Sequence, residues 1–82
     1  MKIWRFECDN GCHGFVAAET EESLGDIVCK NVNDLDEWYY TEISDVDAED
    51  FMIYDDDLGI EISLKDMSDR QDKESILILS VD

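Results

Sequence analysis

The stretch KIWRFECDNGCHGFVAAE, residues 2–19, decides the fold that we predict for this chain. Apolar and polar residues alternate on both sides of Asn10-Gly11, a dipeptide that strongly favours a β-hairpin because a type I′ turn needs positive φ at both central residues. A two-residue turn there predicts that Cys8 faces His13 across the two strands. The core face of this hairpin is then expected to contain Trp4, Phe6, Cys8, His13, Phe15 and Ala17.

A helix is predicted directly after the hairpin, over residues 21–31. Thr20 is a favourable N-cap, and the two glutamates that follow it lie where the helix dipole stabilises negative charge. The apolar stripe consists of Leu24, Ile27 and Val28, at the spacing of one helix face. Cys29 lies on the flank of that stripe, about 120° from its centre at about 100° per residue.

The remaining sequence predicts strands over residues 36–44, 60–65 and 75–81. A short helical turn is expected over residues 47–51, with Asp45 as its cap, and a polar turn over residues 67–73. Residues 75–81 are apolar on both faces and are therefore expected to form a central or covered strand. The predicted fold class is α+β: one domain, residues 1–82, with one main helix packed on an antiparallel sheet of four to five strands.

Charge is the unusual property of this composition: 23 acidic residues face six basic ones, for a formal net charge of -17. No lysine or arginine occurs between Lys30 and Lys65. Direct binding of nucleic acid or of an anionic membrane is excluded, because both need a basic surface. The acids of this base-free stretch are Asp34, Asp36, Glu37, Glu42, Asp45, Asp47, Glu49, Asp50, Asp55, Asp56, Asp57 and Glu61.

These acids are candidate partner-binding residues. A run of charge is usually a solvated face, but the same stretch also holds Trp38, Tyr39, Tyr40, Phe51, Met52 and Tyr54. Aromatic residues and methionine are enriched in protein interfaces. Outward side chains on a strand are about 6.8 Å apart, comparable with the spacing of phosphates along a nucleic-acid backbone. We therefore expect the partner to be a basic, nucleic-acid-binding protein.

The three cysteines and the single histidine indicate a structural zinc site. Cys8-x-x-x-Cys12 has the spacing of a zinc-binding pair, Cys29 follows on the helix, and His13 is the natural fourth ligand. In a strict two-residue hairpin Cys12 would point away from Cys8 and His13, so four-fold ligation requires a wider loop. Asp9 or Asp26 could otherwise complete the shell. Free thiols and a disulfide stay open as alternatives.

No catalytic residue is predicted, and the chain is expected not to be an enzyme. Cys8 and His13 have the reach of a catalytic dyad, but nothing in the sequence supplies an oxyanion hole, and the negative charge disfavours a thiolate. The aspartates do not match an EF-hand from either Asp45 or Asp55. The N-terminus does not resemble a signal peptide and no apolar run has the length of a membrane span, so a cytosolic location is expected.

The opening MKIWRFECDNGCHGFVAAETEESLGDIV, residues 1–28, resembles that of small phage proteins. In size, acidity and α+β pattern the whole chain is similar to the DNA-mimic inhibitors of bacteriophages, among them the anti-CRISPR proteins. The resemblance implies binding to the basic surfaces of an RNA-guided nuclease complex, a type II effector first, in the bacterial host cytosol. It includes no shared motif, so no residue role follows from it. The alternative is a zinc-stabilised adaptor domain of another assembly.

Overall fold

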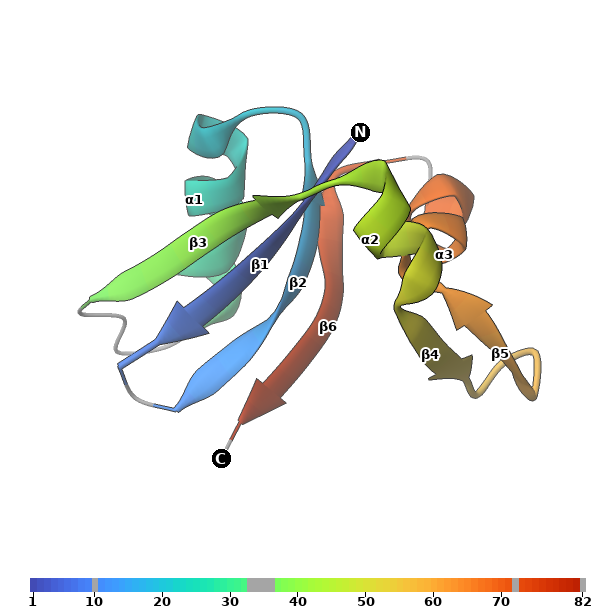
Figure 1. Ribbon diagram of the computed structural model, residues 1–82. Helices are drawn as coiled ribbons and strands as arrows, with labels where there is room; N and C mark the ends of the chain where they lie inside the picture. The colour runs from blue at the N-terminus through green and yellow to red at the C-terminus, as the bar shows by residue number, and fades with distance from the viewer. Residues whose placement is uncertain (10, 33–36, 72, 82) are drawn as a thin grey trace.

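The computed structural model describes residues 1–9, 11–32, 37–71 and 73–81, the side chain of Val81 excepted. In chain order the elements are β1 (Lys2–Cys8), β2 (Cys12–Ala18), α1 (Glu21–Asn31), β3 (Trp38–Ile43), α2 (Asp45–Asp50), β4 (Met52–Asp55), β5 (Ile60–Ser63), α3 (Leu64–Gln71) and β6 (Ser75–Val81). β1, β2, β3 and β6 form an antiparallel sheet in the order β3-β1-β2-β6 (Figure 1). β4 and β5 form a second, two-stranded sheet.

The N-terminal hairpin forms, but its predicted register is wrong by one residue. Three residues, 9–11, separate β1 from β2, and Glu7 rather than Cys8 pairs with His13. Gly11 has a φ of 91° and donates its N–H to the Cys8 carbonyl at 3.1 Å. A three-residue loop that ends on a residue with positive φ is a common hairpin connection. The loop therefore takes one residue more than the two-residue turn that Asn10-Gly11 predicts.

This shift moves every side chain of β2 to the other face of the sheet. Trp4 pairs with Val16, and Phe6 pairs with Gly14. The prediction of the core face is therefore wrong for β2. His13, Phe15 and Ala17 point to the face of the sheet away from Trp4, Phe6 and Cys8. The side chains that share a face with Trp4, Phe6 and Cys8 come instead from Cys12, Val16 and Ala18.

Helix α1 covers this face, and its predicted limits are confirmed. The Thr20 hydroxyl accepts a hydrogen bond from the Ser23 N–H at 3.1 Å and caps the first turn. Leu24 and Val28 are completely buried against the sheet. The core on this face, which we call the α1 core, consists of Trp4, Phe6, Cys12, Val16, Ala18, Leu24, Val28 and Val32.

The opposite face of the sheet is covered by α2 and α3 (Figure 1). This second core, the α2/α3 core, consists of Ile3, Ala48 and Leu64, with the half-buried Phe15, Ile43, Ile53 and Leu77 packed around them. Both faces of the sheet are thus apolar. The prediction of one main helix is therefore incomplete, because α2 and α3 form a second helical layer on the other face of the sheet.

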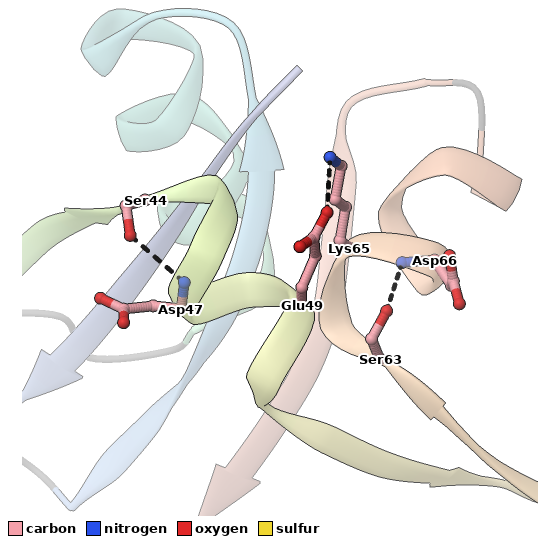
Figure 2. Close-up of polar contacts among 6 residues, drawn as sticks. All are labelled: Ser44, Asp47, Glu49, Ser63, Lys65 and Asp66. Atoms are coloured by element: carbon pink, nitrogen blue, oxygen red, sulfur yellow. Dashed lines mark hydrogen bonds and ion pairs between the residues drawn. The ribbon is translucent and has the colours of Figure 1, made fainter.

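Serine hydroxyls cap both helices of that second layer (Figure 2). Ser44 accepts from the Asp47 N–H at 3.2 Å, so Asp45 is the first helical residue and not the predicted cap. Ser63 accepts from the Asp66 N–H at 3.1 Å and begins α3, where a polar turn was predicted over residues 67–73. A serine three residues before an aspartate is a sequence signature of a helix start.

Strand β6 lies at one edge of the main sheet, so of the two predicted alternatives, a central or a covered strand, it is the covered one. An irregularity in the β2–β6 pairing lies between Phe15 and Val16. Successive side chains of a strand point to opposite faces, so Ile76 packs with the α1 core while its neighbour Leu77 packs with the α2/α3 core. The strand is apolar on both faces because both of its faces are covered, although its outer edge is free of a partner strand in the described sheet.

Candidate functional site

The acids of the base-free stretch lie on three successive parts of the chain. Glu37 and Glu42 belong to β3 or its start, the next four to α2, and the last four to the hairpin of β4 and β5. Asp34 and Asp36 lie outside the described residues. The described members are exposed, except for the half-buried Asp55: Glu37, Glu42, Asp45, Asp47, Glu49, Asp50, Asp55, Asp56, Asp57 and Glu61.

The structure divides this predicted array into two groups. β3 is one edge strand of the main sheet, whereas the β4–β5 hairpin projects from the other side of the molecule, beyond β6 (Figure 1). Helix α2 connects the two. We call α2 and the β4–β5 hairpin, residues 45–63, the acidic arm.

Exposed apolar side chains gather on the same stretch. Among the described residues, the large apolar side chains that are exposed are Tyr39, Tyr40, Val46, Phe51, Met52, Tyr54, Leu58 and Ile60, together with Met1 and Leu79 elsewhere. Six of these ten belong to the acidic arm. A soluble domain normally buries such residues or scatters them singly, so a concentration beside charge of one sign is typical of an interaction surface.

Two of the predicted partner-binding acids are neutralised by cations of the chain itself. Lys2 lies 3.6 Å from Glu42 on β3, and Lys65 lies 3.2 Å from Glu49 on α2 (Figure 2). The hydrogen bond and the charge of Glu49 raise the pKa of Lys65, and Asp45 and Asp69 raise it further. Within the described part of the chain, no ion pair is found for the acids of the β4–β5 hairpin.

The tip of that hairpin is an ordered turn. The Asp55 carboxylate accepts hydrogen bonds from the N–H groups of Asp57, at 2.9 Å, and Leu58, at 3.3 Å. Gly59 takes a φ of 70° and donates its N–H to the Asp55 carbonyl at 2.8 Å. Asp55 therefore organises the turn, while Asp56 and Asp57 present exposed carboxylates beside it.

A concavity of about 330 Å³ lies between this turn and the body of the protein. Tyr54 and the three aspartates of the turn line it from the hairpin, Met67 and Gln71 from α3, and Leu77 from β6. Its lining thus combines apolar surface with carboxylates. We call it the hairpin groove.

The sequence did not indicate this groove, because residues 67–73 were predicted to form a turn. The signals that would have placed α3 are Ser63 three residues before Asp66, and the helical spacing of Leu64, Met67 and Ser68. With that helix in place, Met67 and Gln71 come to lie opposite the hairpin turn.

The predicted zinc ligands are separated by the hairpin register. Cys8 and Cys12 share the α1 face, whereas His13 lies on the other face, so the prediction that Cys8 faces His13 is wrong. Cys29 is exposed on α1. Burial raises the pKa of the Cys8 thiol, and Cys12 and Asp9 raise it further.

The described residues include no group of three or more His, Cys, Asp or Glu side chains placed to hold a metal ion. His13 contacts the Gly11 carbonyl through Nδ1 at 3.4 Å instead. The four predicted ligands therefore do not fit one zinc ion in this arrangement. Zinc binding by Cys8, Cys12, His13 and Cys29 stays a prediction.

No family model matches this chain, and no curated protein or solved structure is significantly similar to it. Among the described helices, none is long and apolar enough to cross a membrane.

Proposed function

We propose that this protein is a non-enzymatic inhibitor that binds a basic nucleic-acid-binding protein through its acidic arm and blocks the binding of nucleic acid. The observation that carries the proposal is the acidic arm itself, where exposed carboxylates alternate with exposed aromatic and aliphatic side chains. Charge steers association with a basic surface, and desolvated aromatic residues supply affinity.

The acidic arm suits a nucleic-acid mimic for two physical reasons. Its carboxylates lie on a short helix and on a hairpin turn, so they are presented by two different elements and not by one strand face. The hairpin projects from the body, which lets it enter a channel that normally holds a nucleic-acid strand (Figure 1). Competition for the same cations would then exclude the nucleic acid.

An RNA-guided nuclease is the proposed partner, on the strength of the resemblance to phage anti-CRISPR proteins. Such an effector holds its heteroduplex and its displaced strand in positively charged channels. The proposed place of action is accordingly the cytosol of a bacterial host.

The test is a DNA-binding assay with a purified type II RNA-guided nuclease loaded with its guide. The wild-type protein is expected to prevent binding of a labelled target duplex when added before the DNA. The double variant Asp56→Lys/Asp57→Lys is expected to lose this inhibition, and it leaves the turn-organising Asp55 in place. Asp26→Lys/Asp69→Lys makes the same change of charge on exposed positions outside the acidic arm and is the control.

Undiminished DNA binding at a large excess of the wild-type protein would exclude this nuclease as the partner. Equal loss of inhibition in both double variants would show that net charge, and not the acidic arm, is responsible. Far-UV circular dichroism of each variant checks that the fold is retained.

Zinc binding is a separate proposal with its own test. Native mass spectrometry before and after a chelator gives the stoichiometry of bound metal. Because His13 lies on the opposite face from Cys8 and Cys12, ligation by all four predicted side chains would require a different hairpin register. A mass equal to that of the bare chain, together with a melting temperature that the chelator does not change, would show that the protein does not bind zinc.

A further inference from the structure

We propose that the hairpin groove is the receptor for a lysine or arginine side chain of the partner, and that the β4–β5 hairpin is therefore the element that docks. This inference rests on the proposed function and deepens it: it assigns the binding to one groove within the acidic surface and names the chemistry of its occupant.

The β4–β5 hairpin is only partly packed against the body of the protein. Ile53 packs against the α2/α3 core, and Ile62, its cross-strand partner, is buried. Met52 and Tyr54 are 51% and 59% exposed, and Tyr54 borders the hairpin groove. A two-stranded sheet is marginal by itself, and this one exposes apolar area that a partner could cover.

β3 is a weaker candidate, because its aromatic side chains are engaged within the protein. Tyr40 packs on Trp38 with ring centroids 5.0 Å apart and donates a hydrogen bond to Glu21 at 3.4 Å. Glu42 is paired with Lys2. Tyr39, 66% exposed, is the large apolar side chain of β3 that extends furthest into solvent.

The lining of the hairpin groove matches the two parts of a long basic side chain. Tyr54, Met67 and Leu77 offer apolar contacts for an aliphatic stem, which lysine and arginine bury readily along apolar surface. The adjoining aspartates supply acceptors for the charged head group. The Tyr54 ring adds a face to which a cation is attracted.

The negative charge of the hairpin groove favours a basic side chain of a partner over a second copy of this chain. Asp56 and Asp57 have no ion pair within the described part of the chain, so a cation from outside would neutralise them. A second copy of this chain, which also carries a net charge of -17, would be repelled. A nucleic-acid-binding protein presents lysine and arginine side chains that neutralise phosphates, which makes it the partner of matching chemistry.

The experiment is a nuclear magnetic resonance titration of the whole isotopically labelled protein with a nona-arginine peptide, at low and at physiological salt. The groove predicts that the largest shifts occur in residues 53–61, Met67 and Gln71. We expect Tyr54→Ser/Asp56→Asn/Asp57→Asn to weaken binding by about tenfold or more, because it removes two charges and an aromatic contact together. The control Tyr39→Ser/Asp26→Asn/Asp69→Asn, which makes the same changes outside the groove, is expected to stay within about twofold of wild type.

The outcomes separate the two proposals. Shifts spread evenly over α1, β3 and the hairpin, or equal weakening in both triple variants, would overturn the groove and leave the general acidic surface intact. Absence of binding at low salt would contradict both proposals. Amide spectra of the variants without peptide show whether each is folded, and a control that unfolds would be replaced by Tyr39→Ser alone.

Discussion

The two faces of the main sheet differ in how completely the apolar side chains packed on them are buried. On the α1 face, Phe6 of the sheet and Leu24 and Val28 of the amphipathic helix that covers it are fully buried. On the other face, the α2/α3 core buries Leu64 and Ala48, but the acidic arm, which contributes Ala48 and Ile53 to this core, leaves several large apolar side chains in solvent. The α1 face is thus the more completely buried of the two, and the exposed apolar side chains of the opposite face belong to the surface that we propose binds a partner.

The largest effect on stability is expected at Gly14, where the backbones of β2 and β6 lie close together. A Cβ at Gly14 would lie 2.0 Å from the carbonyl oxygen of Ile78 on β6, which is backbone and cannot move aside. We expect Gly14→Ala to lower the free energy of unfolding by about 3 kcal/mol or more, because β2 and β6 must separate. Chemical denaturation measures it.

Gly25→Ala is the matched control. A Cβ there would lie 3.9 Å from the Trp38 side chain, which is ordinary contact, and the helix would gain about 0.5–1 kcal/mol from the better propensity of alanine. Equal stability of Gly14→Ala and wild type would show that β6 does not pack on β2 as described.

The next prediction compares the two cores directly. Leu24→Ala and Leu64→Ala each remove a completely buried side chain and are expected to cost about 2–5 kcal/mol. Both tryptophans pack in or against the α1 core, so tryptophan fluorescence reports on that face. We expect Leu64→Ala to lower the melting temperature seen by circular dichroism more than that seen by fluorescence. Coincident transitions would indicate that the two faces unfold together.

The sequence predicted the elements of the α1 face well and those of the other face poorly. Alternation in residues 2–19 and the cap at Thr20 are local signals, and they placed β1, β2 and α1 within a residue. The hairpin register was missed because it depends on a loop of three residues, while Asn10-Gly11 favours two. α3 was missed because its sequence is polar apart from Leu64 and Met67, and its burial comes from tertiary packing.

The sequence indicated which residues make up the candidate site, but not how they are arranged in space. Counting acids identified the base-free stretch, but no local pattern shows that β3 lies at one edge of the sheet and the hairpin on the other side. Similarly, the spacing of Cys8 and Cys12 was visible, whereas the face on which His13 lies depends on the register. The first is a property of long-range pairing and the second of the length of one loop, and sequence periodicity encodes neither.

A smaller effect is expected from the caps of the acidic arm and α3. Ser63→Ala removes the acceptor for the Asp66 N–H and should lower the free energy of unfolding by about 1 kcal/mol. Ser44→Ala removes the equivalent bond to Asp47 at an exposed position, and a similar or smaller loss is expected. Thermal melts of both variants, with Ser63→Thr as a conservative rescue, check the prediction. A Ser63→Thr variant no better than Ser63→Ala would contradict the capping role.

The smallest effect concerns Lys65, which joins α2 to α3. Because Glu49 raises the pKa of Lys65, the ion pair stabilises the folded state below the ordinary value of 10.5, and this contribution is lost as the pH rises through the higher folded-state pKa. Melting temperatures measured between about pH 9 and pH 12 should therefore fall less in Lys65→Gln than in wild type. Lys30→Gln, at the exposed end of α1, is the control and should follow wild type.

The most direct test of partner binding by the acidic arm is affinity capture from a bacterial lysate at two salt concentrations, with identification of the bound protein by mass spectrometry. We expect a DNA- or RNA-binding protein that is retained at low salt, released at high salt, displaced by excess duplex DNA, and captured less by Asp56→Lys/Asp57→Lys than by Asp26→Lys/Asp69→Lys. Capture of a neutral partner that neither salt nor DNA releases would contradict this expectation.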